Sequence, residues 1–568
     1  GKGYPHRPVC SNLIMFDAPL HMKRLSAVAE RPRTCPITNK ERSMSKKVRD
    51  AWGSRIGVVL AAAGCAVGLG NFLRFPGVAA RNGGGAFMIP YFVAFLFLAL
   101  PLCWMEWAMG RYGGRFGHGS APGVFDAVSN RRHPWLKYFG VLGITGALGI
   151  FFYYVYIESW TLAYSVFALT GRYAEIDTPD RMGTFLGSYL SGSGDFFQSR
   201  FTAYGFFLVT FAANFWVVYH GISRGIERFC KFAMPLLFIT AVVLMVRVFT
   251  LGTPVNPEWT LDRALGFLWN PDFTALKSGR VWLEAAGQVF FSTSVGIGVL
   301  LTYATYLKAQ DDVLLPASSA SFLNEFCEVV LGGSIVVPAA FLFFGPQGTA
   351  QAVEGGTFGL AFLTTPLIFN HMAGGAWIGF AWFVLLFTAG VTSSVSILQP
   401  SIAFLEEEFG FNRKRCVTAI GLVCFAVAHL AIFGDGVVDE MDFWFSSFGL
   451  PMFGLFEALV FVFCFGPERG WRELHAGSSL RLPAFFKPII TFVTPLFLFT
   501  ILAGWLATDG WQTIIMKKRV DGHLVPLYAE AQIPWVIATR LLYLALIALA
   551  CLCIRRAWKK RSASAETF

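Results

Sequence analysis

Charged residues are scarce in this chain. Asp, Glu, Lys and Arg make up 14% of its 568 residues, whereas a soluble domain usually carries about 25%. Hydrophobic residues make up 55%, and a single soluble core stops growing at roughly 250–300 residues. A soluble globular protein is therefore excluded, and lipid is expected to surround much of the surface.

The sequence also lacks the patterns that covalent chemistry requires. Walker, nucleophile-elbow and zinc-ligand motifs are absent, so no enzyme is expected. Most of the eleven cysteines fall within apolar stretches, and the connection 170–200 contains none, which argues against a disulfide framework or a metal centre. The net charge of +11 does not indicate nucleic acid, because the basic residues lie in short loops between apolar stretches.

Long apolar stretches make up most of the chain. A helix that crosses a bilayer needs about 20 mostly apolar residues. Twelve stretches reach this length, namely 52–80, 86–110, 138–169, 201–220, 229–250, 282–307, 322–344, 374–405, 416–434, 443–466, 485–507 and 533–554. The sequence therefore predicts an all-α membrane protein with twelve transmembrane helices.

Basic residues mark one side of this protein. They occupy the N-terminal tail, the connections after the second, fourth and eighth stretches, and the C-terminal end. Because Lys and Arg favour cytoplasmic loops, we expect both termini in the cytoplasm and a multi-pass protein of the cell inner (plasma) membrane. Residues 1–43 are polar and basic, and Met44 begins a segment that reads like a natural start. We expect 1–43 to be disordered and dispensable.

The predicted topology implies an inverted repeat. Five crossings leave the chain outside, so the next five run with opposite polarity, a recurrent plan of secondary transporters. We expect a tail (1–50), a first repeat (51–252), an outer loop (253–281) and a second repeat (282–466). Residues 467–556 would hold a cytoplasmic loop and helices 11 and 12, before a tail at 557–568.

The first helix of each repeat carries clustered glycines, in 64–71 and in 292–298. Glycine costs about 1 kcal/mol relative to alanine inside a helix, so both helices are expected to unwind at mid-membrane. Unwinding frees backbone carbonyls, which suit a hard cation, and helix N-termini, which suit a carboxylate. The alternative is that the glycines serve close helix packing. Their recurrence in both halves favours the binding site.

These segments closely resemble the neurotransmitter:sodium symporter family. The motifs are GCAVGLGNFLRFP (64–76), NGGGAFMIPY (82–91), YYVYIESW (153–160), GQVFFSTSVGIG (287–298), NEFCEVVLGGS (324–334), FTAGVTSS (387–394) and DEMDFW (439–444). The resemblance covers about residues 50–556 in one order. It is strongest to the bacterial amino-acid transporters, typified by the bacterial leucine transporter.

The resemblance implies two sodium sites. The first would use Ala66 O, the side chains of Asn71 and Asn324, and Ser292 through carbonyl and hydroxyl, completed by the substrate carboxylate. The second would use carbonyls of Gly64, Val67 and Ala389 with the hydroxyls of Thr392 and Ser393. All of these donors are oxygens, which hard cations require. Taken alone, the hydroxyls of 392–394 are better explained by bonding to the backbone within a helix.

The resemblance also implies a substrate site. Its residues would be Ala66, Leu69, Gly70, Ile150, Tyr154, Phe291, Ser294, Ile297, Ser393 and Ile397. Tyr154 and the amides near Leu69 and Gly70 would bind the substrate carboxylate. The leucine transporter has Val at the position of Ile150 and Phe at that of Ile297, so the preferred side chain stays open. The apolar lining favours a neutral aliphatic or aromatic amino acid.

Glu328, Glu106 and Glu158 lie within predicted spans, where charge is costly and usually functional. Glu328 stands where chloride-dependent relatives carry serine, so it is expected to replace chloride, with Tyr91, Gln288 and Ser294 nearby. Glu106 and Glu158 are expected to orient the unwound segments, or else to pair with a nearby hydroxyl or amide.

Gates are expected on both sides of the site. Arg74 and Asp442 match an outer pair, with Tyr154 and Phe291 as the lid beneath it. Arg49 and Glu407 match an inner pair, with Trp52 and Tyr306 beside it. Because Glu406 and Glu408 flank Glu407, the inner partner stays open, and a solvated surface contact is the alternative.

Together these features predict a sodium-coupled symporter of a neutral amino acid that works by alternating access without chloride. Its cofactors would be two sodium ions and no organic group, and its partners an amino acid and the lipid bilayer; a homodimer is compatible with the sequence. Two alternatives remain open. One is a proton-coupled carrier of the same fold, and the other is a membrane receptor that senses amino acids.

Overall fold

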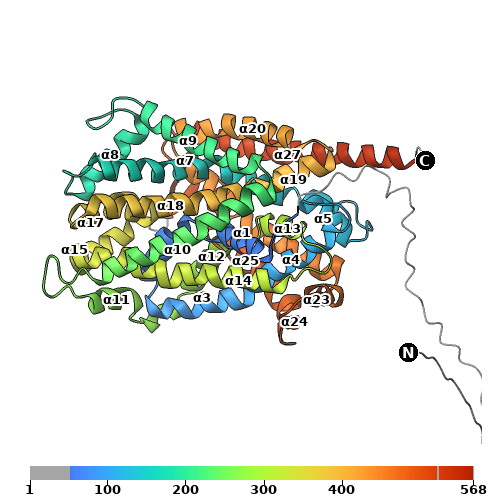
Figure 1. Cartoon of the computed structure of the whole chain (residues 1–568), viewed down its shortest axis with the longest axis horizontal. Helices are drawn as coiled ribbons and strands as arrows, with labels where there is room; N and C mark the ends of the chain where they lie inside the picture. Colours follow the sequence, from blue (N-terminus) through green and yellow to red (C-terminus); the bar gives the residue numbers. More distant parts are fainter. Residues whose placement is uncertain (1–50, 521–522, 567–568) are drawn as a thin grey trace, which may run out of the picture. The chain divides into compact units, whose positions relative to one another are not determined.

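The structure is a computed structural model that describes residues 51–520 and 523–566. Helices run side by side through this part of the chain, and the only strands within it are β1 (Lys517–Val520) and β2 (His523–Pro526), which pair antiparallel (Figure 1). The predicted disordered segment 1–43 and Arg49 lie outside the described residues.

Ten helical segments of the described residues are long and apolar enough to cross a membrane. They are Gly85–Gly114, Leu136–Thr170, Phe201–Tyr219, Ile222–Phe249, Leu314–Glu354, Gly375–Glu408, Arg413–Phe433, Val437–Phe465, Phe486–Trp505 and Ile533–Lys559. An eleventh is gained if α1 and α2 count as one bent span. The all-α membrane fold is confirmed, and the count of twelve and the inverted repeat remain predictions.

The remaining bounds locate the labels of Figure 1 within these segments. They are α3 (Met88–Ala94), α4 (Leu100–Gly114), α5 (Ala121–Val128), α7 (Leu142–Thr170), α8 (Pro179–Ser191), α9 (Phe201–Tyr219), α10 (Arg228–Phe249), α11 (Leu261–Trp269), α14 (Leu314–Glu325), α15 (Gly333–Glu354), α17 (Thr365–Asn370), α18 (Gly375–Ile397), α19 (Gln399–Glu408), α20 (Arg413–Phe433), α22 (Gly449–Leu459), α23 (Pro467–His475), α24 (Phe486–Pro488), α25 (Thr494–Trp505) and α27 (Ile533–Glu566).

The first broken helix consists of α1 (Arg55–Ala66) and α2 (Leu69–Arg81), bent by 49°. The link is extended at Gly68 (φ −128°, ψ −163°), whose N–H donates to Asn71 Oδ1 at 2.8 Å. The Asn71 side chain thus caps the second half-helix, because a helix start leaves backbone N–H groups without partners. The break leaves the carbonyls of α1 and the N–H groups of α2 facing the same interior region.

The second broken helix consists of α12 (Gly279–Thr293) and α13 (Val299–Ala304). Ser294, Gly296 and Gly298 have φ of 55°, 71° and 80° in the link, a region that favours glycine. Space also requires glycine at position 296, because a Cβ there would lie 2.5 Å from Leu450 O. The glycines of 292–298 therefore end the helix rather than only packing it.

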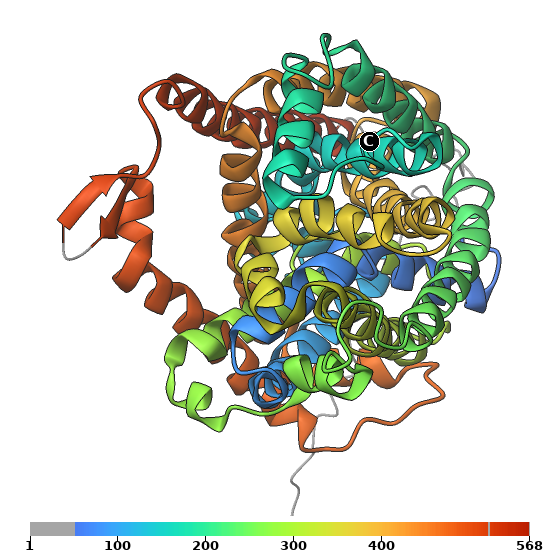
Figure 2. The ribbon, with the colours of Figure 1, turned by 90° about the vertical axis from the view of Figure 1, so that its left-hand side faces the viewer.

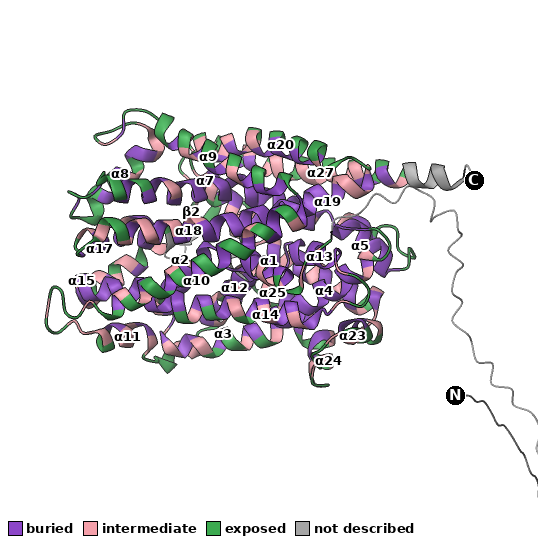
Figure 3. Ribbon diagram, in the orientation of Figure 1, coloured by how far each residue is buried: buried purple, intermediate pink, exposed green. Residues whose placement is uncertain are grey.

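Burial separates the inner helices from the lipid-facing ones. α7 and α18 pack along each other and against α1, α9 and α10, and in Figure 3 they are largely purple, the colour of buried residues. In the apolar windows of Leu136–Thr170 and Gly375–Glu408, 83% and 78% of residues are buried, against 17% in Ile533–Lys559. Apolar residues exposed on the last helix fit a bilayer, where lipid replaces water.

The hairpin β1–β2 joins the last two spans and stands out to one side of the bundle in Figure 2. A buried carboxylate anchors it. Glu440 accepts from Arg540 Nε at 2.6 Å and from Trp444 Nε1 at 2.7 Å, and Tyr528 after β2 also donates to it. Arg540 in turn donates to Ile514 O before β1.

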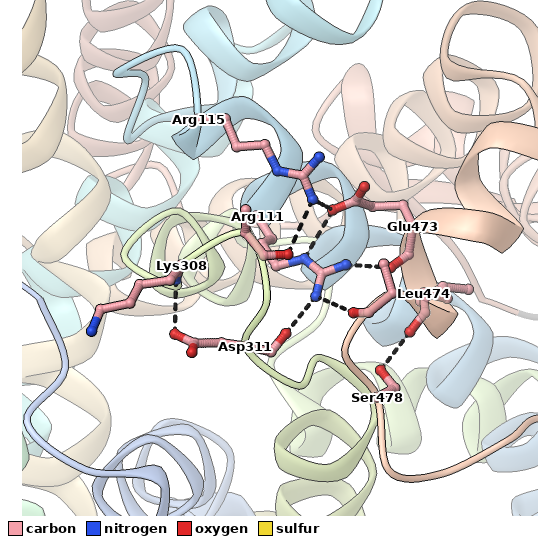
Figure 4. Close-up of polar contacts among 9 residues, drawn as sticks. Arg111, Arg115, Lys308, Asp311, Glu473, Leu474 and Ser478 are labelled. Carbon is pink, nitrogen blue, oxygen red and sulfur yellow. Dashed lines mark hydrogen bonds and ion pairs between the residues drawn. The ribbon is translucent and has the colours of Figure 1, made fainter. Parts of the chain in front are cut away.

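At the end of the bundle that carries α5 and α23, one buried arginine joins three segments. Arg111 of α4 donates through Nε to Glu473 Oε1 at 2.8 Å and through Nη1 to Ala476 O at 2.7 Å. It also donates to the carbonyls of Asp311 and Glu473. Figure 4 shows the guanidinium enclosed by these groups. Arg111 thereby holds the 308–312 loop, which follows α13, against α23.

A second contact joins the same two segments. Asp312 accepts from Ser479 N at 2.7 Å and from Leu315 N at 3.0 Å. Burial alone would raise the pKa of this carboxyl, but the hydrogen bonds outweigh burial and hold the pKa below its usual value. A carboxyl with a depressed pKa stabilises the fold above its unfolded pKa, and that stabilisation is lost as pH falls through the folded pKa. This contact therefore weakens only in acid.

Replacing Arg111 with alanine is expected to lower the melting temperature of the purified protein strongly. The change removes the buried donor of one carboxylate and three carbonyls, and breaking a buried ion pair costs about 3–5 kcal/mol. The matched control is Arg115→Ala, because Arg115 binds the same Glu473 oxygen but has a side chain that is 33% exposed. This control should cost about 1 kcal/mol or less. Equal melting temperatures for the two variants would contradict the assigned role.

Candidate functional site

A cavity lies where the two broken helices meet α7 and α18. Its empty space amounts to about 430 Å³, with the part open to solvent included. All ten residues predicted to bind substrate line it. The structure adds Cys65, Gly68, Ser446 and Leu450, which sequence reasoning missed; the first two lie inside the glycine motif itself.

The cavity is polar at one end. The N-terminus of α2 faces Tyr154 of α7, and Leu69 N donates to the Tyr154 hydroxyl at 3.5 Å. A helix N-terminus attracts a carboxylate, because its N–H groups are unpaired and its dipole is positive there. The opposite wall is apolar and comes mainly from Ile150, Ile297, Ile397, Phe291 and Leu450. This arrangement suits a small molecule with one anionic end and an apolar side chain.

The residues of the first predicted sodium site lie together. Asn71 Nδ2 donates to Asn324 Oδ1 at 2.8 Å, and Asn324 Nδ2 donates to Ser292 Oγ at 2.6 Å. Asn324 Oδ1 also lies 3.2 Å from both Ala66 O and Ser292 O. In this orientation of the Asn324 amide, three oxygens converge. A hard cation satisfies such a set, although turning the Asn324 amide would instead direct N–H groups at the two carbonyls.

The residues of the second predicted sodium site also lie together. Ser393 Oγ lies 3.3 Å from Gly64 O and 3.4 Å from Val67 O, across the gap between α18 and α1. Thr392 Oγ1 lies 3.0 Å from Ala389 O. Gly64 packs closely against Thr392, because a Cβ at position 64 would lie 3.2 Å from the Thr392 Cβ. The donor set contains only oxygen, so it too fits a hard cation.

Glu328 lies beside the first set, fully buried. Its carboxylate accepts from Gln288 Nε2 at 2.5 Å and Asn71 Nδ2 at 3.1 Å, and also from the Ser292 hydroxyl. Gln288 is therefore next to Glu328, as expected. Ser294 was also expected there, but its hydroxyl donates to Cys65 O at 2.9 Å instead of to Glu328. Ser294 lies beyond the end of α12 in a left-handed conformation, which turns it toward α1.

One further acidic residue, Glu325, is buried near this region. Glu325 lies one helical turn before Glu328, and Tyr91 lies close to both carboxyl groups. Sequence reasoning missed Glu325, although an acidic residue within an apolar stretch was a visible signal. Two buried carboxyl groups, Glu325 and Glu328, thus lie together beside the first predicted sodium site.

Glu106 and Glu158 have different roles from each other. Glu106 Oε1 accepts from Gly296 N at 2.6 Å, so it does orient the link between α12 and α13. Glu158 has no hydrogen bond to either link among the described residues. Its carboxylate accepts from Asn214 Nδ2 at 2.9 Å, and Asn214 in turn accepts from the Ser394 hydroxyl. Because Glu158 faces α9 and α18 across a helix interface, it joins three helices behind the second sodium set.

The predicted outer gate residues line a second cavity that adjoins the first and has about 790 Å³ of empty space, with the part open to solvent included. Tyr154 and Phe291 line both cavities, so they lie between them as a lid would. Arg74 and Asp442 do not form an ion pair within 4.0 Å in the described chain. Asp442 accepts from the Tyr153 hydroxyl at 2.7 Å, and Arg74 stacks 4.9 Å from the centre of the Phe291 ring.

The predicted inner gate is seen in part, because Arg49 lies outside the described residues. Glu407 lies against Gly119. Trp52 Nε1 donates to Tyr303 O at 3.0 Å and packs edge-on against the Tyr303 ring. The Tyr306 hydroxyl accepts from Gln399 Nε2 at 2.7 Å. Tyr303, which the sequence did not single out, is therefore the aromatic partner of Trp52.

Known proteins are similar to this chain in sequence. A sequence model described as the sodium:neurotransmitter symporter family matches residues 49–177 and 202–557. An uncharacterized sodium-dependent transporter of Methanocaldococcus jannaschii is 29% identical over 85% of this chain and 96% of its own length. The sodium-dependent serotonin transporter of Drosophila melanogaster is 24% identical over 83% of this chain and 79% of its own.

The fold of this chain is also similar to that of a solved structure. The crystal structure of MhsT in complex with L-phenylalanine superposes with a TM-score of 0.67 and 28% sequence identity. The match covers 80% of this chain and 99% of that one.

Proposed function

Because the chain belongs to the sodium:neurotransmitter symporter family, and is therefore a sodium-dependent membrane transporter and not an enzyme, we propose that it imports a neutral, hydrophobic amino acid. Sodium ions drive this import by alternating access, and chloride takes no part. The protein lies in the inner (plasma) membrane with both termini in the cytoplasm.

The central cavity carries this proposal. Its N–H-rich and hydroxyl-bearing end at Leu69 and Tyr154 suits a carboxylate, and its wall of Ile150, Ile297 and Ile397 suits an apolar side chain. An amino acid with a charged side chain would leave that charge buried against isoleucine, which is strongly unfavourable. The L-phenylalanine named with the MhsT structure supports the same class of substrate.

Two sodium ions fit the two oxygen sets. The first set adjoins the polar end of the cavity through Asn71 and Ser292, so the substrate carboxylate completes it. Ion and substrate then strengthen each other's binding by the same factor, because coupling between sites is reciprocal. Each ion that enters contributes about 2.3 kcal/mol per 100 mV of membrane potential. The second set joins α1 to α18 and so holds one half of a broken helix against a helix that packs along α7.

Glu328 supports independence from chloride. Its carboxylate accepts hydrogen bonds from Asn71 and Ser292. It therefore places a fixed negative charge beside the first ion. A chloride ion at the same place would bring a second negative charge into a buried site, at a cost that rises steeply at low dielectric.

Equilibrium binding to the purified protein tests the substrate class. Radiolabelled phenylalanine or leucine should bind in sodium chloride and equally in sodium gluconate, with binding lost in choline chloride. In competition across the twenty amino acids, neutral aliphatic and aromatic ones should displace the label, and Asp, Glu, Lys and Arg should not. Displacement by charged amino acids, or binding without sodium, would contradict the proposal.

A further inference from the structure

A pair of buried carboxyl groups lies outside the sodium and substrate sites. Glu106 projects from α4 and Glu457 from α22, two helices that pack together. Both side chains are fully buried, and the two carboxyl groups contact each other. Neither residue bonds to a group that we assign to sodium.

Three of the four carboxyl oxygens accept no hydrogen bond from the described chain. Glu106 Oε1 accepts from Gly296 N at 2.6 Å, but Glu106 Oε2 and both oxygens of Glu457 have no donor there. The other ionisable groups that face Glu106 within the described residues are the thiols of Cys65 and Cys103, which bring no positive charge. If neither group held a proton, two charged carboxylates would face each other without a positive partner. Such an arrangement is strongly unfavourable in the interior of a protein.

A metal ion does not fit this pair. Within the described residues no three His, Cys, Asp or Glu side chains come together as a metal site would need. Hard cations take about six oxygen ligands, whereas the surroundings here are apolar: Leu102 and Phe290 pack against Gly454, one turn before Glu457. A single proton needs only the two facing oxygens.

We propose that Glu106 and Glu457 bind one proton between them, and that this proton keeps α4 and α22 closed on the link between α12 and α13. The proton removes one of two like charges and supplies the missing donor, since an O–H to carboxylate bond is among the strongest hydrogen bonds. It comes from water on the side to which the site opens and returns to water when the site opens again.

The position of the pair connects the proton to transport. Glu106 holds Gly296, and Ser294 and Ile297 on either side of Gly296 line the substrate cavity. Loss of the proton sets two carboxylates against each other, which separates α4 from α22 and releases the link. Transport is therefore expected to fall at alkaline pH. This step rests on the proposed function, but proton binding itself does not.

Infrared spectroscopy of the purified protein tests proton binding without transport. The carboxylic-acid C=O stretching band at neutral pH should lose the intensity of one acid group in Glu457→Gln, and the same in Glu106→Gln. Because the proton is shared, the double variant should lose no more than either single variant. Glu354→Gln, at an exposed helix end, should leave the band unchanged. Intact band intensity in both single variants, or twice the loss in the double variant, overturns the proposal.

The pH dependence of uptake tests the connection to transport. Between about pH 7 and about pH 9, uptake by the unmodified protein should fall at least about threefold, because deprotonation of an essential group removes activity. Uptake by Glu457→Gln should change less than about 1.5-fold, since the amide still donates to Glu106 and cannot lose a proton in this range. An equal fall in both proteins, or a band that responds to sodium concentration rather than pH, overturns the proposal. Melting temperatures of the variants confirm that each is folded.

Discussion

Replacing Asn71 with alanine is expected to abolish sodium-driven uptake and to weaken sodium binding at least about 100-fold, or about 2.8 kcal/mol. Asn71 receives the N–H of Gly68 and donates to Asn324 and Glu328. It therefore caps α2, orients the predicted sodium ligand Asn324 and stabilises the buried carboxylate of Glu328 by a hydrogen bond. Removing a partner from buried charged groups costs more than an ordinary hydrogen bond. Sodium titration of labelled amino-acid binding measures the change.

The control for this variant is Asn256→Ala. The Asn256 side chain accepts from Glu258 N in an exposed loop, so its loss should leave sodium affinity within about twofold of the unmodified value. A sodium affinity for Asn71→Ala within about threefold of the control would mean that the ion binds elsewhere. Both variants should be compared at equal protein recovery, so that folding losses are not counted as weaker binding.

Replacing Glu328 with serine is expected to make binding and uptake depend on chloride. Serine removes the buried negative charge that now accepts from Gln288 and Ser292 and leaves room for an anion beside the same donors. Uptake in sodium gluconate should fall at least about tenfold, corresponding to about 1.4 kcal/mol, and should return when gluconate is replaced by chloride. The measurement is initial uptake at constant sodium in the two salts.

Glu328→Gln is the informative partner of this variant. Its amide is neutral but nearly as large as the carboxylate, so it removes the charge without making room for an ion. We expect low uptake in both salts. If Glu328→Ser works equally well in gluconate and chloride, the fixed charge is not what replaces chloride.

The helical fold could be predicted from sequence because each span carries its own signal in length and hydrophobicity. The two breaks were also predictable, since glycine clusters such as 64–70 and 296–298 weaken the first helix of each predicted repeat at matching positions. Helix bounds were less predictable: the span expected at 322–344 runs from Leu314 to Glu354, because helices continue beyond the apolar core as far as packing and capping support them.

The candidate site was predictable where a short motif carries several ligands at once. Ser393 lies beside the expected carbonyls of Gly64 and Val67, because the motif fixes the spacing of those carbonyls around a helix break. Side chains that meet across helices far apart in sequence were not predictable. The contacts of Glu158 with Asn214, and of Glu106 with Glu457, depend on helix rotations that no local pattern encodes.

The ring of contacts around Arg111 was unpredictable for a related reason. An arginine at the end of an apolar span is expected to mark a membrane boundary, and many such residues reach water. Arg111 instead is fully buried under α23, because a loop that follows another span folds back over it. Only the three-dimensional arrangement distinguishes it from Arg115, four residues later.

Uptake into proteoliposomes under an imposed gradient tests the central claim most directly. With sodium outside and potassium with valinomycin inside, labelled neutral amino acid should accumulate above its external concentration and leak out when the sodium gradient is collapsed. A proton gradient without sodium should drive no accumulation. Sodium-dependent binding without accumulation would identify a sensor, and accumulation driven by protons alone would identify a different carrier; either result would contradict the account.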